Sequence, residues 1–560
     1  MKPSRSSSIA FSLGVAALVL GTAASVSTLV FLWEAWWSGP AVDSWHFVNV
    51  LVAHEQGSDL WRRLAKNHGG HRPFFPRLLL LADYAWFGGR NVFVLVWGVV
   101  LQLSTWWALV WAAQRESMNI GRSAVAFAAG LVLALCFCAT QLENFARAWN
   151  VHWFLVSAVV AWSLVALAAA GAAQTRRAVV VGTAVAVLLA GVATWSMANG
   201  VLVWGLLVFT ALWLRLPLPV PAAILVAGAL VAWSFQSGYM PGRGVHVAAL
   251  WTAPLSRVIW VVRCLGAPLS WWHPNAGAVL GAAGLVTFLL AAAHAARRRP
   301  RPADVVCLGV AAFWMGSAFL VAWGRTAYSG ESWGTPRYQT LSLLFWASLL
   351  TWLVVRIGSG PVALGVRAVM LVGVATLLIP SHFAQGARVG TFAERVRAAH
   401  LALVVGVSDR SAYQATLPFS DRKRRRDAAK RHAGFLRGRQ LGMFHDGRHT
   451  LLGRQLDVLH PQRSEACEGG IFRSADSASK RWVRVDGWAR EVGSVRVPDL
   501  IFTDPMGRVI GLGEPLRHPL FGAEDAAPHF VAWRHAAPAG EVWAVLGDGS
   551  ACRVAAWGRA

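Results

Sequence analysis

The sequence predicts an α-helical polytopic membrane protein with about eleven transmembrane helices and a C-terminal extracytoplasmic β-sandwich domain. Hydrophobic residues make up 56% of the 560 residues, and the mean hydropathy is +0.47. Charged residues make up only 14%, against roughly 25% in an ordinary soluble domain. The apolar residues occur in blocks long enough to cross a bilayer. This composition excludes a soluble enzyme, a disordered chain, a fibrous protein and a disulfide scaffold.

The first predicted span follows Lys2 and Arg5 and carries no charge between Ile9 and Trp33. A cleaved signal peptide has a shorter apolar core, so we expect an uncleaved helix that enters from the cytoplasm. Ten further spans are predicted at residues 92–113, 123–140, 151–173, 178–195, 201–214, 220–235, 276–296, 305–324, 340–355 and 368–379.

The formal net charge of +25 comes mainly from arginine. Short cytoplasmic loops of membrane proteins collect Lys and Arg, so this excess predicts orientation in a membrane and no nucleic-acid partner. The apolar stretch 250–272 contains Arg257, Arg263 and Pro268. If it crossed the membrane, the basic cluster 297–301 would lie outside, so an interfacial or re-entrant helix is predicted. An odd number of spans places everything after Ser381 outside the cytoplasm.

The composition divides the chain into a transmembrane domain (1–380, with a first outer loop at 34–90), a basic helical connector (381–460) and a small β-sandwich (461–560). Short alternating stretches in the last segment predict strands, and Asp504–Gly507 predicts a turn between two of them. Cys467 and Cys552 are the only cysteines in this segment. In an oxidising compartment a disulfide between them is favoured.

The first outer loop holds the richest set of chemical groups. Asp43 and Glu55 supply carboxylates, and His68, His71 and Arg72 follow them. A carboxylate can remove the proton from a hydroxyl that attacks the anomeric carbon of a sugar. Arg and His can hold a departing phosphate and offset its negative charge. The stretch 74–87 is apolar on one face and is predicted to lie along the interface.

Polar residues in other predicted outer loops add candidates for the same face. Each of these residues also has an alternative role outside a binding site. An Arg can contact lipid headgroups, and Asp43 can cap a helix or face solvent as a charge. The His residues can form hydrogen bonds at the membrane interface. A metal site of Asp43 with two His residues, and so a divalent cation, stays open, and no other cofactor is predicted. The further candidates for substrate or phosphate binding are Arg77, Asn144, Tyr239, Arg243, Arg325, Arg337 and Tyr338.

Several short motifs resemble those of a known group. They are His71-Arg72, Pro76-Arg77-Leu78, Phe87-Gly88-Gly89-Arg90-Asn91, Gln141–Phe145 and Pro336-Arg337-Tyr338. Together with an acid-bearing first outer loop, many spans and an exported C-terminal domain, they resemble an uncharacterised bacterial branch of the GT-C integral membrane glycosyltransferases. Gly70 stands where this branch has an acid before His-Arg, so Asp43 and Glu55 are the nearest replacements.

The resemblance implies transfer of a sugar from a polyprenyl-phosphate carrier to a cell-envelope glycan or lipid, at the outer face of a bacterial plasma membrane. Asp43 would be the base and Glu143 an auxiliary acid or orienting group, while Arg72 and Arg337 would hold phosphate. The expected partners are the lipid-linked donor, a glycan or lipid acceptor, and membrane lipid. A transporter or flippase for lipid-linked saccharides, or an inactive assembly protein, is the alternative function.

Overall fold

The computed structural model describes residues 5–237, 254–269, 274–325, 334–407, 411–416, 422–456, 467–476, 480–491, 499–515, 529–546 and 551–557. The chain forms two compact units. The first, called the helical unit here, comprises Met1–Leu29, Trp61–Leu78 and Leu95–Gly386. The second, called the mixed unit, comprises Val30–Leu60, Leu79–Val94 and Ala387–Ala560. Each is described by itself.

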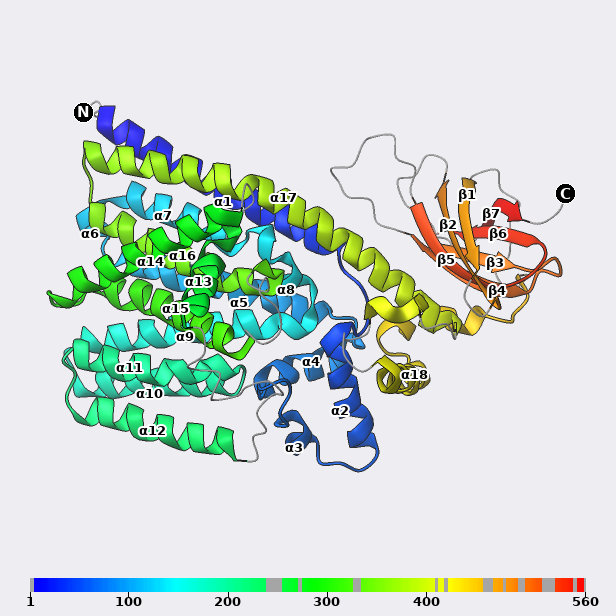
Figure 1. Cartoon of the computed structure of the whole chain (residues 1–560), viewed down its shortest axis with the longest axis horizontal. Coiled ribbons are helices and arrows are strands. Elements are labelled where there is room, and N and C mark those ends of the chain that lie inside the picture. Colours follow the sequence, from blue (N-terminus) through cyan, green and yellow to red (C-terminus); the bar gives the residue numbers. More distant parts are fainter. Residues whose placement is uncertain are drawn as a thin grey trace. The chain divides into compact units, whose positions relative to one another are not determined.

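The helical unit is built from helices that run alongside one another (Figure 1). Five helices of the described chain contribute residues to both units: α1 (Arg5–Glu34), α3 (Leu60–Leu64), α4 (Phe74–Phe87), α5 (Val92–Gln114) and α17 (Pro361–Val405). Further α-helices lie entirely within the helical unit: α6 (Ser117–Ile120), α7 (Arg122–Cys136), α8 (Leu142–Ala146), α9 (Val151–Gly171), α10 (Arg176–Thr194), α11 (Leu202–Trp213), α12 (Pro219–Gln236), α13 (Pro254–Gly266), α14 (Pro274–Ala296), α15 (Gly309–Arg325) and α16 (Gln339–Ile357).

Ten helical segments in the described part of the chain are long and apolar enough to cross a membrane, and the shorter segment Ala198–Trp213 is also apolar. Together they coincide with the eleven predicted spans, which confirms a multi-pass membrane protein. The spans that contain α7, α9 and α16 bury 72–83% of their most apolar window, whereas those of α10, α12 and α14 bury 22–28%. The former therefore form the centre of the helical unit, and the latter present apolar side chains to lipid.

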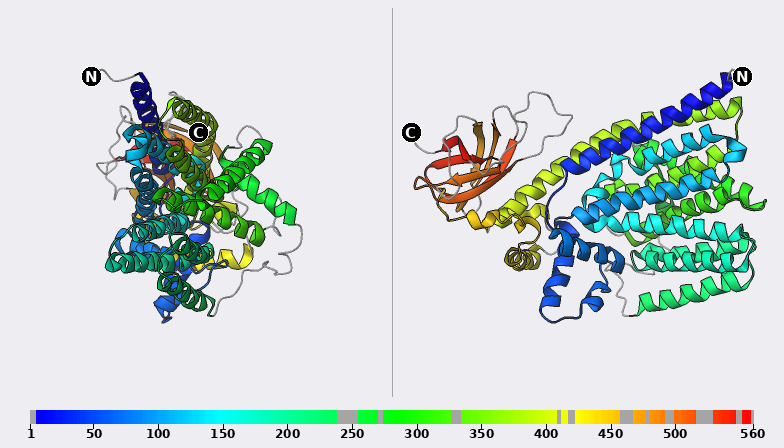
Figure 2. Two further views of the ribbon diagram at one scale, coloured as in Figure 1. Left: turned by 90° about the vertical axis from the view of Figure 1, so that its left-hand side faces the viewer. Right: turned by 180° about the vertical axis from the view of Figure 1, so that it is seen from behind.

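Glycines allow the closest helix contacts in this unit. A side chain at Gly21 of α1 would collide with the backbone of Gly130 of α7, and one at Gly281 of α14 would collide with the carbonyl of Val262 in α13. Small residues at such crossings let helix backbones approach closely. Close packing matters in a bilayer because the hydrophobic effect does not drive helices together there, so their association depends on van der Waals contacts. Helix α1 also lies along α17 (Figures 1 and 2). Ser27 Oγ of α1 is 2.8 Å from His382 Nε2 of α17.

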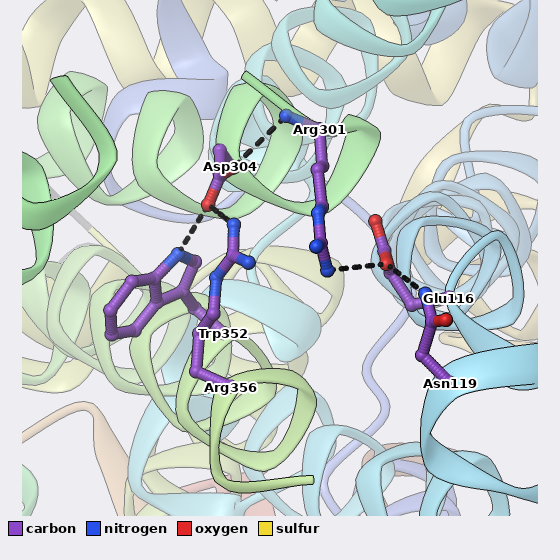
Figure 3. A network of polar contacts seen from close by, with 6 residues as sticks. All are labelled: Glu116, Asn119, Arg301, Asp304, Trp352 and Arg356. Atoms are coloured by element: carbon purple, nitrogen blue, oxygen red, sulfur yellow. Dashed lines mark hydrogen bonds and ion pairs between the residues drawn. The ribbon is translucent and has the colours of Figure 1, made fainter. Parts of the chain in front are cut away.

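A polar network closes one end of the helical unit (Figure 3). The Asp304 carboxylate accepts a hydrogen bond from Trp352 Nε1 at 2.8 Å and forms an ion pair with Arg356. Arg301 donates its backbone N–H to Asp304 at 3.0 Å, and its guanidinium lies 3.4 Å from Glu116. The network thus joins the turn after α5 to the start of α15 and the end of α16. All of its basic residues fall in predicted cytoplasmic breaks.

The mixed unit combines the second half of α17 with α2 (Trp45–Glu55), α18 (Arg422–Gly438) and a seven-stranded antiparallel sheet. Trp533 donates its indole N–H to the carbonyl of Ala398 in α17 at 3.1 Å, which ties the sheet to that helix. The strand order is β1-β2-β5-β4-β3-β6-β7, with β1 (Cys467–Asp476), β2 (Trp482–Glu491), β3 (Asp499–Thr503), β4 (Val509–Pro515), β5 (His529–His535), β6 (Gly540–Val545) and β7 (Ala551–Trp557).

The predicted disulfide is confirmed, and it joins the two edge strands of this sheet. Cys467 lies on β1 and Cys552 on β7, with their Cα atoms 5.9 Å apart. Strands β1 and β7 also contact each other, so the C-terminal β domain closes in a barrel-like or sandwich-like arrangement. The predicted turn forms as well: Asp504 accepts backbone N–H groups from Met506 and Arg508, and Gly507 adopts φ +75°.

Two predicted helical segments differ in length from the helices of the structure. The last predicted span, 368–379, is part of α17, which continues without a break through Pro380 to Val405. A helix tolerates proline at position 380 when neighbouring groups satisfy the freed carbonyl. The predicted interfacial segment 250–272 contains α13, which is 13 residues long and includes buried Arg257. The division into domains at residues 380 and 460 stays a prediction.

Candidate functional site

A tight hairpin carries the two His residues of the first outer loop. His68 and His71 exchange backbone hydrogen bonds of 2.7 and 2.9 Å, and between them Gly69 and Gly70 adopt φ +57° and +86°. Two consecutive positive φ angles define a turn that strongly favours glycine. Gly70 therefore has a conformational reason to stand where an acid was expected.

The hairpin places both imidazoles against other loops of the helical unit. His68 packs edge-on to Trp149, with ring centroids 4.8 Å apart. His71 Nδ1 accepts the backbone N–H of Ala198 at 3.0 Å, so the proton of a neutral His71 is on Nε2. The His71 ring lies 6.5 Å from that of His152. Predicted outer loops that are far apart in sequence thus come together at this end of the unit.

Two predicted phosphate ligands on this loop donate to backbone carbonyls. Arg72 donates to the carbonyls of Ser234 and Ser237 at the end of α12, and its guanidinium lies over Trp195 at 5.4 Å. Arg77 donates to the carbonyls of residues 63, 64 and 66 and lies 5.7 Å from the Trp149 ring centroid. Burial lowers the pKa of Arg77 to about 10. Both arginines hold loops in place.

Buried amides connect the third and tenth predicted spans. Asn144 Nδ2 donates to Thr340 Oγ1 at 2.8 Å and to the carbonyl of Arg337 at 2.9 Å. Thr340 donates to Gln141 Oε1 at 2.7 Å, and Asn150 donates to Asn144 Oδ1 at 3.0 Å. Because each amide has its partner, this network fixes the Gln141–Phe145 segment against the Pro336–Tyr338 turn. Asn144, predicted to bind substrate, thereby positions the backbone of Arg337.

Arg337 and Tyr338 are held at the edge of this network, and each offers an atom that lacks a partner. The Tyr338 side chain is buried between Trp153 and Trp260, yet its hydroxyl has no hydrogen-bond partner in the described part of the chain. Arg337 lies over the Tyr338 ring at 5.3 Å, and its buried Nε likewise has no protein acceptor among the described residues. Unpaired buried donors of this kind are suited to an anionic ligand.

Glu143 makes an ion pair with Arg147 at 2.7 Å, and both side chains are largely buried. Arg147 was missed in the sequence, although its spacing of four residues from Glu143 on a helical turn is a signal for such a pair. Thr340 and His152 were also missed, since single Thr and His residues beside an apolar span carry no distinctive pattern.

In the mixed unit, Asp43 follows a residue in a rarely populated conformation. Asp43 lies in a short 3-10 helix, Val42–Ser44, and buried Val42 adopts φ +51°. A β-branched residue rarely has positive φ, because its side chain collides with the backbone. Such strain is found preferentially at functional sites. Within the described residues the Asp43 carboxylate has no hydrogen bond or ion pair, and its oxygen and a His46 ring nitrogen lie within 4.8 Å.

Neighbouring segments of the mixed unit hold this loop in place. His400 of α17 donates its Nε2 proton to the carbonyl of Pro40 at 2.9 Å. Trp45 donates its indole N–H to the carbonyl of Thr416 at 3.1 Å. These buried contacts flank Asp43 on both sides in sequence and keep it on a rigid support.

The other acids of the first outer loop have protein partners. Glu55 forms an ion pair with Arg439 at the end of α18, in an open groove that Tyr84 and Phe435 also line. Asp83 accepts the backbone N–H groups of Asn91 at 2.8 Å and Phe93 at 2.7 Å, and so caps the start of α5. Asp43 is therefore the loop acid with a carboxylate available for chemistry.

The remaining predicted residues cannot be placed in this site. Tyr239 and Arg243 lie outside the described residues, and only the backbone of Arg325 is described, at the end of α15. Asp43, His46 and Glu55 belong to the mixed unit. His68, His71, Arg72, Arg77, Glu143, Asn144, Arg337 and Tyr338 belong to the helical unit.

No protein-family model and no curated protein matches the chain. Similar solved structures include the oligosaccharyltransferase AglB from Archaeoglobus fulgidus in complex with an inhibitory peptide and a dolichol-phosphate, with 14% identity over 73% of this chain and a TM-score of 0.39. Another structure of the enzyme from this archaeon, with Zn and sulfate, has 13% identity over 72% of this chain and the same TM-score. The chain spans 60% and 58% of the length of these two proteins.

A further similar structure is ArnT from Cupriavidus metallidurans bound to undecaprenyl phosphate. It has 15% identity over 77% of this chain and 78% of its own length, with a TM-score of 0.38.

Proposed function

We propose that the protein is a membrane glycosyltransferase that moves a sugar from a polyprenyl-phosphate carrier to a cell-envelope glycan or lipid at the extracytoplasmic face of a bacterial plasma membrane. The observation that carries this proposal is Asp43: a half-buried carboxylate with no partner among the described residues, held next to strained Val42. A structural acid would be paired, as Glu55 and Asp83 are.

Asp43 acts as the base in this reaction. Its carboxylate takes the proton from an acceptor hydroxyl while that oxygen forms a bond to the anomeric carbon. The bond between the anomeric carbon and the phosphate oxygen breaks, and polyprenyl phosphate leaves with the electron pair.

Arg337 and Tyr338 bind the phosphate of the donor. Both residues belong to the helical unit, where the guanidinium of Arg337 and the Tyr338 hydroxyl can donate hydrogen bonds to phosphate oxygens. The amide network around Asn144 supports both residues, so little ordering is needed when the phosphate arrives. Glu143 and Arg147 are held as a pair, which suits an orienting role for Glu143.

The carboxylate of Asp43 and the imidazole of His46 could together hold a divalent cation. Asp43 and His46 offer two ligand atoms within 4.8 Å of each other, and a cation such as Mg²⁺ or Mn²⁺ commonly takes few protein ligands together with water and substrate phosphate. Bound there, the cation would occupy the Asp43 carboxylate, so this arrangement is the alternative to Asp43 as the base and would supply charge stabilisation for the leaving phosphate.

The proposed reaction is tested by separating sugar transfer from transport. The purified full-length protein is placed in liposomes with a polyprenyl-phosphate sugar whose sugar carries a label. We expect free polyprenyl phosphate to appear together with labelled acceptor. Movement of intact donor between leaflets without cleavage would instead support the transporter alternative, and would contradict the proposal.

A further inference from the structure

A second cavity lies wholly within the mixed unit, apart from the carboxylate of Asp43. Its volume is about 170 Å³, enough for roughly five water molecules at about 30 Å³ each. A phosphate or carboxylate group with an attached small moiety fits such a space. Chain segments before α2, after α4, in α17, after α18 and in β4 contribute its walls. The charged or titratable lining residues are Arg90, Arg397, His400, His445, Asp446, Arg448 and Glu514.

Two of the arginines in this wall are fixed by protein contacts. Arg397 donates Nε to the carbonyl of Trp36 at 3.0 Å, and a second nitrogen to the same oxygen at 2.6 Å. Arg448 pairs with Asp499 at 3.1 Å and donates to the carbonyl of Gly513. Because these side chains are already ordered, a ligand that meets them loses little affinity to the ordering of side chains.

The third arginine, Arg90, lacks such contacts. Its Nε is buried, and its guanidinium has no hydrogen bond or ion pair with any residue that the structure describes. The backbone at this position is nonetheless fixed, since the carbonyl of Arg90 accepts the indole N–H of Trp36 at 3.0 Å. The nearest carboxylate that feels the charge of Arg90 is Asp83, and its oxygens already accept the backbone N–H groups of Asn91 and Phe93. An anion in the cavity would give the guanidinium the hydrogen-bond acceptors that the described residues do not provide.

Glu514 faces the same cavity from β4 without a hydrogen-bond partner in the described part of the chain. Burial raises the pKa of its carboxyl, and the charges of Arg448 and Arg397 oppose this shift. A protonated carboxyl donates a hydrogen bond, which an anionic oxygen can accept. The other acid in the wall, Asp446, is exposed and accepts the backbone N–H of Arg448 at 3.1 Å.

We propose that this cavity binds the acidic group of a small ligand, a phosphate or a carboxylate, through Arg90, with Arg397 and Arg448 as fixed positive charges. Trp36, Leu401 and Val404 give the cavity an apolar side that would cover the rest of the ligand. Such an acidic group can belong to a soluble compound or to an anionic lipid headgroup. The proposal does not depend on the transferase activity proposed above.

The binding test uses purified full-length protein and two probes: inorganic phosphate in solution, and phosphatidylglycerol in nanodiscs, with phosphatidylcholine nanodiscs as the reference. We expect saturable binding of at least one anionic probe and a loss of affinity of tenfold or more in Arg90→Gln. Binding of phosphate identifies a soluble ligand, and binding of phosphatidylglycerol alone identifies a headgroup. Arg395→Gln is the matched control, because exposed Arg395 lies on the same helix as Arg397 but outside the cavity.

Two further variants separate this proposal from loss of folding and from cation binding. Arg90→Lys keeps the charge, so it is expected to bind better than Arg90→Gln at an equal melting temperature. Glu514→Gln keeps a donor, so anion affinity should be kept or increased. Equal affinity in the native protein and Arg90→Gln, binding of neither probe, or a tenfold loss of anion affinity in Glu514→Gln would overturn the proposal.

Discussion

Tyr338 carries a buried hydroxyl for which the described residues provide no hydrogen-bond partner. Leaving such a group unpaired costs free energy, so natural proteins do it rarely and often at functional positions. Arg337 Nε and the Asp43 carboxylate are the other groups of this kind among the proposed reacting residues. At the scale of single residues, the candidate functional residues are those whose polar groups have no hydrogen-bond partner among the described residues.

Replacement of Tyr338 by Phe tests this role. Because the hydroxyl makes no bond within the described protein, Tyr338→Phe is expected to leave the melting temperature unchanged. A hydrogen bond to a charged phosphate contributes about 1.5–3 kcal/mol, so the KM for the lipid-linked donor should rise about tenfold or more. Ser348→Ala is the control, since Ser348 lies in α16, the helix that follows Tyr338, and its hydroxyl bonds only within that helix. A lower melting temperature with unchanged KM would assign Tyr338 a structural role.

His432 makes the stability of the mixed unit depend on pH. It is buried on α18, stacked on Trp45 at 6.4 Å, and burial lowers its pKa to about 4, with Arg431 and His46 adding to the shift. The folded protein therefore prefers neutral His432. Its contribution is fully present above pH 6.5 and is lost as the pH falls from 6.5 towards 4.

We expect the melting temperature to fall over this pH range in the native protein and to fall less in His432→Phe, which cannot titrate and keeps an aromatic ring on Trp45. Exposed His54 provides the control variant His54→Gln, which should behave like the native protein. An identical pH profile for His432→Phe would contradict the assignment.

At the scale of elements, the Asp304 network joins the segment before α15 to the last turns of α16 (Figure 3). Tyr338 precedes the opposite end of α16. Asp304→Ala leaves the guanidinium of Arg356 buried without its counter-charge, and we expect a loss of about 3–5 kcal/mol in the free energy of unfolding. Adding Arg356→Met should recover much of that loss. Reversible unfolding in detergent micelles measures both values.

The ion pair between Arg301 and Glu116 provides a comparison for the loss of stability in Asp304→Ala. Half of the Arg301 side chain is exposed, so Arg301→Gln should cost less than about 1 kcal/mol. Equal losses for Asp304→Ala and Arg301→Gln would show that burial does not decide the strength of these pairs.

Elements with a strong local pattern were predictable from the sequence. The apolar face between residues 74 and 87 predicted α4 with the observed bounds, because the pattern begins after Pro73 and ends before paired glycines. The extent of α17 was not predictable, since its second half is held by packing against the sheet of the mixed unit. Arg90, Arg397 and Glu514 were missed for a similar reason: only the fold brings segments so far apart in sequence to one cavity.

At the scale of the whole molecule, the number and order of apolar blocks determined the multi-pass architecture and the separate β domain. The candidate residues were harder to assign, because Asp, Glu and Arg in a loop look alike in sequence whether or not they have partners. The structure separates paired acids such as Glu55 from unpaired Asp43. It also gives Gly70 a place in a turn that favours glycine, which accounts for the absence of an acid at this position.

The most direct test of the proposed transferase is single-turnover sugar transfer from a polyprenyl-phosphate donor by the native protein, Asp43→Asn and Asp59→Asn. Asp59 is an exposed acid of the same loop and serves as the control. We predict that Asp43→Asn lowers the transfer rate by at least about 100-fold, the contribution typical of a general base, while donor affinity and the rate of Asp59→Asn stay near native values. Transfer by Asp43→Asn at the native rate would contradict the account.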